Sequence, residues 1–196
     1  VIERKDVLSA AFYLAAFLTY IKFYRKEKWI SYVMALFFFI CGMLSKSIVV
    51  TFPIALLLYF WWKQGRISGA DLQRLTPFFF LAVAMASADV WLAKSQEQMN
   101  YGYSFLERVL IASRALCFYA YKLIWPSNLA VVYPRWQIDV GFGLQYIFPA
   151  LVMFVLGAFW LGRNTLGKGP LVAILYFSIT LGPVLGFIDF GYMRYA

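Results

Sequence analysis

The residues that could do chemistry in this sequence are few, and most of them are cations. Histidine is absent, and nine carboxylates stand against 18 lysines and arginines in 196 residues. No two carboxylates stand isolated at the spacing that acid and base pairs use in sugar-cleaving sites. Cys41 and Cys117 lie far apart without the spacing of metal ligands, so we expect no metal site and no cofactor. The sequence therefore offers groups that bind a negative charge rather than a nucleophile with its base.

Lys46 is the first of these cations, because it stands alone in the very short turn Ser45-Lys46-Ser47 between two apolar runs. An ammonium in so short a turn cannot move far, which favours contact with the phosphate of a lipid. The alternative is a lysine that only extends its side chain from a membrane span to the interface. We predict the phosphate contact.

Arg4 and Lys5 are the next candidates, within the charged start Glu3-Arg4-Lys5-Asp6 of the first apolar run. Glu3 and Asp6 can neutralise the two cations locally, which would make the segment an interfacial anchor held by ion pairs. We therefore expect Lys46 to be the stronger ligand, assisted by Arg4 or Lys5.

These cations are separated by apolar runs that predict membrane-spanning helices. Hydrophobic residues make up 63% of the chain and charged residues 14%, whereas soluble domains carry about 25% charged residues. A hydrocarbon layer of about 30 Å requires helices of about 20 residues. Tryptophans near the ends of many runs are typical of membrane interfaces. Seven runs qualify: 7–24, 29–44, 48–62, 77–93, 105–125, 144–161 and 170–188.

The run Phe105–Trp125 differs from the others, because its charged residues gather on one face. At about 100° per residue, Glu107, Arg108, Arg114 and Lys122 fall within an arc of roughly 120°. This pattern predicts a helix that lies on the membrane surface. Ile111 and Phe118 interrupt the arc, so a seventh span that lines a polar cavity stays open as an alternative.

The charge distribution favours the surface helix. If 105–125 does not cross, segments 22–28, 63–76 and 162–169 share one side and carry nine basic and two acidic residues, against nine basic and seven acidic on the other. The positive-inside rule makes the first side cytoplasmic. We therefore predict an all-α polytopic transmembrane helix bundle of six spans and one exoplasmic surface helix.

Two other patterns are given a structural interpretation. The net charge of +9 is spread over the breaks between runs, so we expect no nucleic-acid partner. Segment 162–169 ends in glycine where a P-loop needs Ser or Thr, and it follows a span instead of a strand, so we interpret it as a turn.

Two further groups complete the candidates. Asp89 lies about 13 residues into an otherwise apolar run, where a carboxylate is costly unless it faces a cavity or reaches the headgroups. Arg135 and Arg194 fall on the predicted exoplasmic side, with Arg135 and Asp89 as possible cavity residues. Because both ends look cut, we interpret residues 1–196 as one transmembrane domain of a larger protein.

Four stretches together resemble the GT-C class of glycosyltransferases, specifically the transmembrane O-mannosyltransferase-like family with tetratricopeptide repeats. They are the start Glu3-Arg4-Lys5-Asp6-Val7-Leu8-Ser9 through Tyr20, Leu44-Ser45-Lys46 through Leu58, Lys122-Leu123-Ile124-Trp125-Pro126-Ser127-Asn128-Leu129 through Tyr133-Pro134, and the tail with Arg194-Tyr195. The chain departs from the family at Tyr59–Trp62, where the family has an acidic residue followed by Trp-Pro.

The resemblance implies transfer of a mannose-like sugar from a polyprenyl-phosphate carrier to an exoplasmic acceptor, such as a protein Ser or Thr. Lys46, Arg4, Lys5 and Arg194 would then bind the donor phosphate. The family's catalytic base would lie upstream of Val1, so we expect residues 1–196 alone to be inactive. The membrane would be the bacterial inner membrane or the endoplasmic reticulum. A multi-pass transporter or assembly scaffold without enzymatic activity is the alternative.

Overall fold

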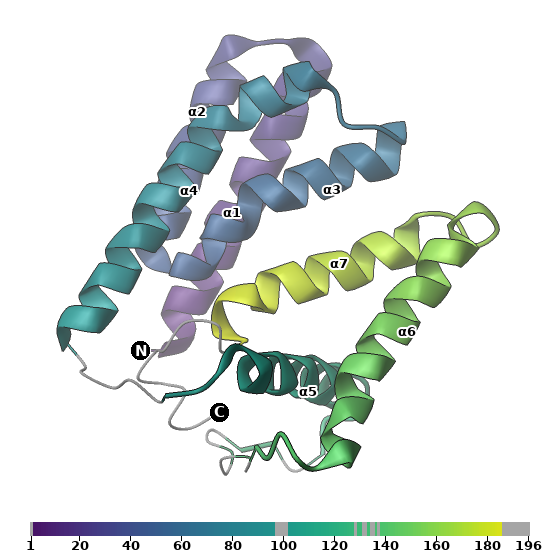
Figure 1. Cartoon of the computed structure of the whole chain (residues 1–196). Helices are drawn as coiled ribbons and strands as arrows, with labels where there is room; N and C mark the ends of the chain where they lie inside the picture. Colours follow the sequence, from purple (N-terminus) through teal and green to yellow (C-terminus); the bar gives the residue numbers. More distant parts are fainter. Residues whose placement is uncertain are drawn as a thin grey trace. The chain divides into compact units, whose positions relative to one another are not determined.

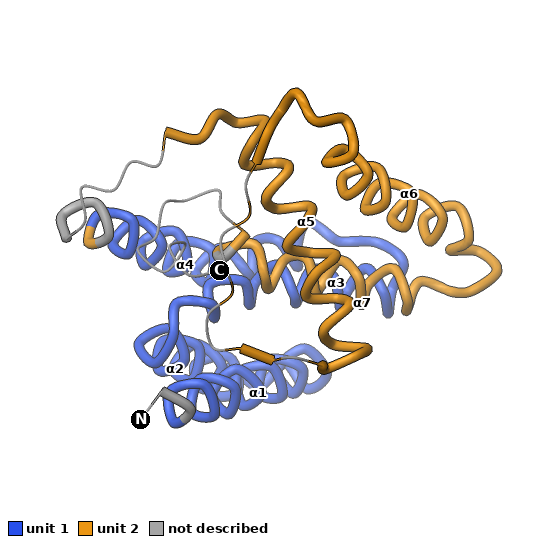
Figure 2. Tube along the Cα trace, turned by 90° about the horizontal axis from the view of Figure 1, so that it is seen from below, with its two compact units in different colours: residues 1–91 blue, residues 92–196 orange. Residues whose placement is uncertain are grey.

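A computed structural model describes residues 2–96, 102–127, 129–130, 133, 136 and 138–185. Every regular element among them is a helix, as the sequence predicted. The chain divides into two compact units, residues 1–91 and 92–196, which Figure 2 shows in different colours. Each unit is described by itself below.

Unit 1 is built from four α-helices and one short 3-10 helix (Figure 1). They are α1 (Ile2–Lys26), α2 (Trp29–Ser45), η1 (Ser47–Thr51), α3 (Phe52–Gln64) and α4 (Gly69–Gln96), the last of which runs past the boundary of the unit. The first two form an antiparallel hairpin joined by Glu27 and Lys28. The Glu27 N–H still donates to the Phe23 carbonyl at 2.7 Å, and the left-handed conformation of Glu27 (φ 50°) then ends α1.

Aromatic side chains form the core of unit 1. Tyr20, Phe39, Phe52, Phe60 and Phe78 are completely buried, and they come from all four α-helices. The Phe78 ring lies 5.5 Å from that of Tyr20 and 5.3 Å from that of Phe39, centroid to centroid. These spacings are typical of favourable aromatic pairs. Unit 1 therefore has a packed core of its own.

Helix α4 begins earlier than the sequence predicted. We expected a polar loop over 63–76 and a span from Pro77, but the helix starts at Gly69 and Pro77 lies inside it. The reason is local capping: the Ser68 hydroxyl accepts from the Ala70 N–H at 3.1 Å, and the Asp71 carboxylate accepts from the Ser68 N–H at 3.0 Å. Such reciprocal bonds satisfy the free donors of a first turn and start a helix in polar sequence.

Unit 2 contains three α-helices and three short 3-10 helices in its described part (Figure 1). They are α5 (Phe105–Ile124), η2 (Gly143–Tyr146), α6 (Ile147–Leu161), η3 (Gly162–Asn164), α7 (Gly169–Leu181) and η4 (Gly182–Val184). Its small core centres on Ala112, Ala115 and Leu185. The last predicted run, 170–188, is shorter as an α-helix, because α7 gives way to η4 around Pro183, which has no N–H to continue it.

In the described part of the chain, four helical segments are long and apolar enough to cross a membrane: Arg4–Lys26, Ser47–Gln64, Gly69–Leu92 and Gly143–Asn164. Two more apolar helices, α2 and α7, are shorter. Helix α5 has 20 residues and is not among the four, because charged residues interrupt it. The prediction of an all-helical chain with several membrane-spanning candidates is confirmed.

Candidate phosphate-binding site

The start of α1 and the end of α2 meet through one ion pair. The Lys46 Nζ lies 2.5 Å from the Asp6 Oδ1, although the two residues are 40 positions apart. Because α1 and α2 are antiparallel, the N-terminal turn of one helix and the C-terminal turn of the other lie at the same end of unit 1 (Figure 1). The structure thus brings Lys46 to the charged start of α1, and the binding of a phosphate there stays a prediction.

The backbone holds Lys46 firmly, as its short turn predicted. Its N–H donates to the Gly42 carbonyl at 3.0 Å, and its carbonyl accepts from the Val49 N–H at 3.2 Å. A Cβ at Gly42 would lie 3.1 Å from the Val49 Cγ1, so glycine allows η1 to fold back closely on α2. The single residue between α2 and η1 is therefore anchored on both sides.

Asp6 pairs with a residue far from it in the sequence. The sequence left open that Asp6 neutralises Arg4 and Lys5 locally, and the structure instead pairs it with Lys46. The physical reason is helical geometry, because residues one and two positions apart do not face each other on a helix. Arg4 and Lys5 are both exposed on the same first turn. Three cations and the Asp6 carboxylate therefore lie at this end of unit 1.

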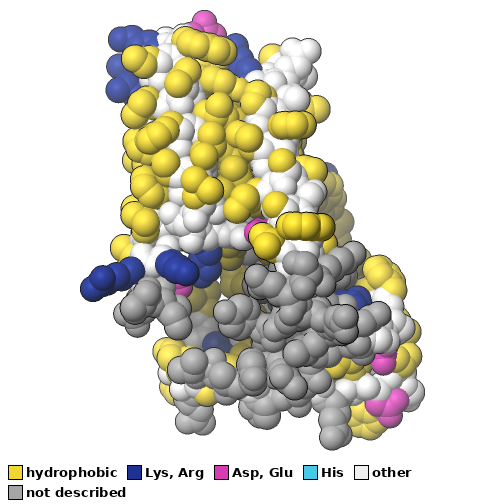
Figure 3. All heavy atoms as spheres, turned by 90° about the vertical axis from the view of Figure 1, so that its left-hand side faces the viewer, with side chains coloured by type: hydrophobic (Ala, Val, Ile, Leu, Met, Phe, Trp, Pro, Cys, Tyr) yellow, Lys and Arg dark blue, Asp and Glu magenta, His cyan; other side chains and the backbone are white. Residues whose placement is uncertain are grey.

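The ion pair is accessible to a ligand. The side chains of Lys46 and Asp6 remain 45% and 51% exposed. A pair this exposed stabilises the fold by about 0–1 kcal/mol, so its main effect is on the position of the ammonium. An apolar surface begins next to it: Figure 3 shows hydrophobic side chains along unit 1 and basic side chains towards its ends. If unit 1 spans a bilayer, a site at this end of its helices would lie at the level of the headgroups.

The remaining predicted site residues are not brought together in the described structure. Arg135 and Arg194 lie outside the described residues. Asp89 is half-buried in α4, two positions before the strongly exposed Trp91. Because exposed tryptophans mark membrane interfaces, this position favours a carboxylate that reaches the headgroups. Its role in a cavity stays a prediction.

The charged face of α5 exists, but each of its four charges is already engaged. Ser104 and Glu107 form a capping box, with the Ser104 N–H donating to the Glu107 Oε2 at 2.6 Å. Hydrogen bonding to the side chain and then the backbone of Ser104 lowers the pKa of the Glu107 carboxyl. Arg108 Nε donates to the Tyr103 carbonyl at 3.3 Å, and Lys122 Nζ donates to the carbonyl of Ser127.

Aromatic side chains cover the same face, which the sequence alone did not reveal. The Arg114 guanidinium lies 4.6 Å from the centroid of the Trp136 ring and 5.5 Å from that of Phe148. Phe118 contacts Trp136 and Tyr133 edge to face, at 5.6 and 4.9 Å between centroids. In the sequence, Phe118 interrupts the polar arc of 105–125. An apolar residue on a charged helix face was the one sign in the sequence that other side chains cover this face.

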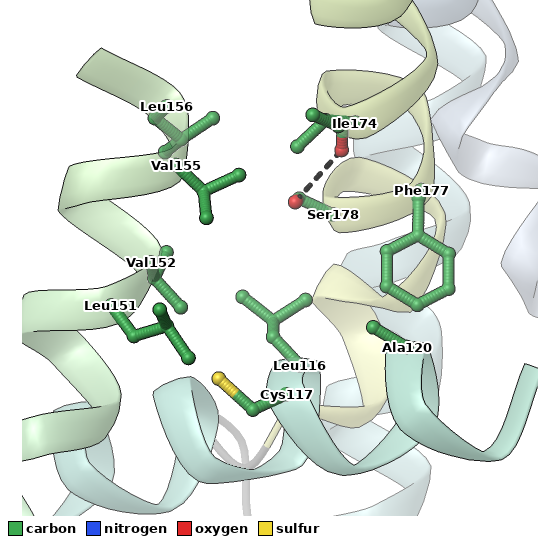
Figure 4. A pocket seen from close by; sticks show the side chains of 10 residues that line it. All are labelled: Leu116, Cys117, Ala120, Leu151, Val152, Val155, Leu156, Ile174, Phe177 and Ser178. Carbon is green, nitrogen blue, oxygen red and sulfur yellow. Dashed lines mark hydrogen bonds between the residues drawn. The ribbon is translucent and has the colours of Figure 1, made fainter. Parts of the chain in front are cut away.

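An apolar cavity of about 250 Å³ lies within unit 2 (Figure 4). Side chains of α5, α6 and α7 line it: Leu116, Cys117, Ala120, Leu151, Val152, Val155, Leu156, Ile174, Phe177 and Ser178. The Ser178 hydroxyl donates to the Ile174 carbonyl at 2.9 Å, and burial raises the pKa of the Cys117 thiol. The cavity has no charged residue in its lining, so it is not the polar cavity of the seven-span alternative.

Within the described ranges, no three His, Cys, Asp or Glu side chains gather as metal ligands would. Comparison of the chain with protein-family models, curated proteins and solved structures gave no match. The resemblance to GT-C glycosyltransferases therefore stays a prediction that depends on the four sequence stretches.

Proposed function

We propose that this chain is part of a membrane-embedded glycosyltransferase that moves a mannose-like sugar from a polyprenyl phosphate to an exoplasmic acceptor, such as a protein Ser or Thr. The observation that carries the proposal is the Lys46–Asp6 pair, which sits beside Arg4 and Lys5 at one end of the apolar unit 1. A polyprenyl phosphate has its tail in the hydrocarbon and its charge at the headgroups, so it would meet these cations without leaving the bilayer.

The cations would act on the leaving group. Transfer breaks the bond between the sugar's anomeric carbon and a phosphate oxygen, and the negative charge that develops on that oxygen must be stabilised. Lys46, with Arg4 or Lys5, would supply positive charge there through charge-assisted hydrogen bonds. The acceptor hydroxyl loses its proton to a base, which the family resemblance puts upstream of Val1.

Asp6 would be a positioning residue in this scheme. Its carboxylate holds the Lys46 ammonium against α1, and the exposure of both groups leaves room for a phosphate oxygen on the same ammonium. Lysine has three N–H donors, so one bond to Asp6 leaves two for the donor. The pair would keep the ammonium in place before the donor arrives.

The proposed topology has six spans, with α2 and α7 as the shorter ones and α5 on the exoplasmic surface. The charge bias of the loops supports it, as do the four charged residues that keep α5 out of the set of span candidates. On this topology the Lys46 site is exoplasmic, the side on which the carrier would present its sugar.

The test is Lys46→Met in the intact protein, with transfer measured against the concentration of a polyprenyl-phosphate sugar. A charge-assisted contact contributes roughly 1.5–3 kcal/mol, so we expect transfer at low donor concentration to fall about ten- to a hundredfold. Arg163→Met is the matched control, because Arg163 contacts Trp160 in the turn after α6 and should leave donor dependence unchanged.

The Asp6→Asn variant tests whether Asp6 positions the Lys46 ammonium for the donor or only links α1 to α2. If Asp6 positions the ammonium, this variant raises the donor KM less than Lys46→Met does. If the pair only links α1 to α2, both variants lower thermal stability equally and leave the donor KM unchanged. Unchanged donor dependence in a well-folded Lys46→Met protein would contradict the proposed function.

A further inference from the structure

The opposite end of unit 1 carries a denser group of cations than the candidate site. Six exposed basic residues surround it, and we call them the basic rim: Lys22, Arg25, Lys26, Lys28, Lys63 and Arg66. They come from the end of α1, the turn before α2 and the segment around the end of α3. The upper edge of Figure 3 shows basic side chains gathered at this end.

Contacts between helices make the rim one continuous surface. Gln64 Nε2 donates to the Tyr24 hydroxyl at 2.7 Å, which ties the end of α3 to the end of α1. The Tyr32 hydroxyl donates to the Arg74 carbonyl at 2.8 Å, which ties the start of α2 to the start of α4. Together with the turn between α1 and α2, these two bonds link the four helix ends to one another at this end of unit 1.

The carboxylates at this end are already engaged. The Glu27 Oε1 lies 3.6 Å from the Nη2 of Arg74, a further cation that is not part of the basic rim. Asp71 is buried and accepts the Ser68 N–H, so its charge serves the first turn of α4. The positive charge of the rim is thus left to attract an external anion.

Large apolar side chains are interleaved with the rim, which identifies the kind of anion. Trp29, Ile30, Trp62 and Ile67 are exposed at the same end, and the Lys63 ammonium lies 4.3 Å from the centroid of the Trp62 ring. Nucleic-acid bases can stack on exposed indole rings, but neither nucleic acid nor a soluble anion would use the exposed aliphatic side chains of Ile30 and Ile67. At a membrane interface the indole rings lie among the headgroups and the cations meet lipid phosphates.

We infer that the basic rim binds the phosphate headgroups of anionic phospholipids and thereby fixes the depth of unit 1 in one leaflet. The inference is independent of sugar transfer, because it concerns the end of unit 1 opposite Lys46. On the topology proposed above, the leaflet is the cytoplasmic one, whose negative surface attracts basic segments next to membrane spans.

The test measures binding of a fluorescent phosphatidylglycerol and a matched fluorescent phosphatidylcholine to the purified full-length protein in detergent. The triple variant Arg25→Gln/Lys26→Gln/Lys28→Gln should bind the anionic lipid about a hundredfold more weakly, from roughly fivefold per cation. Binding of phosphatidylcholine should not change. The matched control is Arg25→Lys/Lys26→Arg/Lys28→Arg, which keeps the charge and should keep the affinity.

Glu27→Gln provides a test in the opposite direction, since it removes the acidic group nearest the rim. It should tighten phosphatidylglycerol binding by a few-fold, and high salt should reduce that gain. Equal affinity of the triple variant and the wild type for phosphatidylglycerol would overturn the inference. Competition by inorganic phosphate as effective as that by lipid would also overturn it, because the rim would then be a site for free anions.

Discussion

Units 1 and 2 contain similar apolar helices but bury them very differently. In unit 1, Phe39 and Phe78 are completely enclosed by the other helices of the unit. In unit 2, no residue of α6 is buried, and α6 lines an apolar cavity together with α5 and α7. Lipid tails are as apolar as leucine, so a membrane helix needs no protein partner to satisfy an apolar face. Unit 1 is held by aromatic packing, whereas α6 has the surface of a helix solvated by lipid.

The charged residues of the two units differ in the same way. In unit 1 most of them lie near the helix ends, where Lys46 and the basic rim remain exposed. In unit 2, Arg114 of α5 is covered by Trp136 and Phe148. The first arrangement leaves charge available for ligands, and the second uses charge to hold a covering segment on a helix.

The largest effect should be a difference in stability between two phenylalanine substitutions, one in each unit. Phe39→Ala removes a fully buried ring from unit 1 and should lower the free energy of unfolding by about 3–5 kcal/mol. Phe154→Ala is the matched change in unit 2, where the ring is exposed on α6, and should cost about 0.5 kcal/mol or less. Denaturant titration of the protein in detergent micelles measures both. Similar losses at the two positions would break the comparison.

An intermediate effect should come from the aromatic cover of α5. Arg114→Ala should destabilise unit 2 by about 0.5–2 kcal/mol, because it removes a cation from the Trp136 ring. Arg114→Lys should recover part of the loss, since an ammonium can still lie over the indole. A double-mutant cycle with Trp136→Leu isolates the contact, and an interaction free energy of zero would show that the two side chains do not depend on each other.

A smaller, pH-dependent effect should appear at the start of α5. Ser104→Ala removes the capping box and should cost about 1 kcal/mol. The bond to Ser104 lowers the pKa of Glu107 from its usual 4.5, so this stabilisation is complete above that pH and is lost as pH falls through the lower folded value. The protection factors of the amides in the first turn of α5, which are exchange rates corrected for the intrinsic rate at each pH, should therefore fall in acid. An equal loss of protection in Ser104→Ala would show that the capping box is not the cause.

The sequence predicted elements well where the signal was local. The predicted helical runs 29–44 and 105–125 match α2 and α5 within one residue at each end, because apolar runs and short charged breaks mark their limits. The start of α4 was missed, since the turn that caps it is made of polar residues that also suit a loop. The isolation of Lys46 in its turn was predicted for the same local reason.

The parts of the site that depend on distant residues were not predictable in the same way. The pairing of Asp6 with Lys46 requires the antiparallel register of two helices, and no spacing in the sequence encodes it. The cover of Arg114 by Trp136 requires a loop to fold back over α5. Both contacts follow from tertiary packing. The sequence alone contains the charged and aromatic residues that make them but does not indicate which residues will meet.

The most direct test of the membrane arrangement is cysteine accessibility in intact cells. Cys41→Ala/Cys117→Ala provides the background, and single cysteines replace Lys26, Arg66, Lys168, Lys46, Glu97 and Arg135 in turn. Because α5 is proposed to lie on the exoplasmic surface, an impermeant maleimide should label positions 46, 97 and 135 from outside, and positions 26, 66 and 168 only after the membrane is opened. Labelling of positions 97 and 135 from opposite faces would contradict this account, because α5 would then cross the membrane.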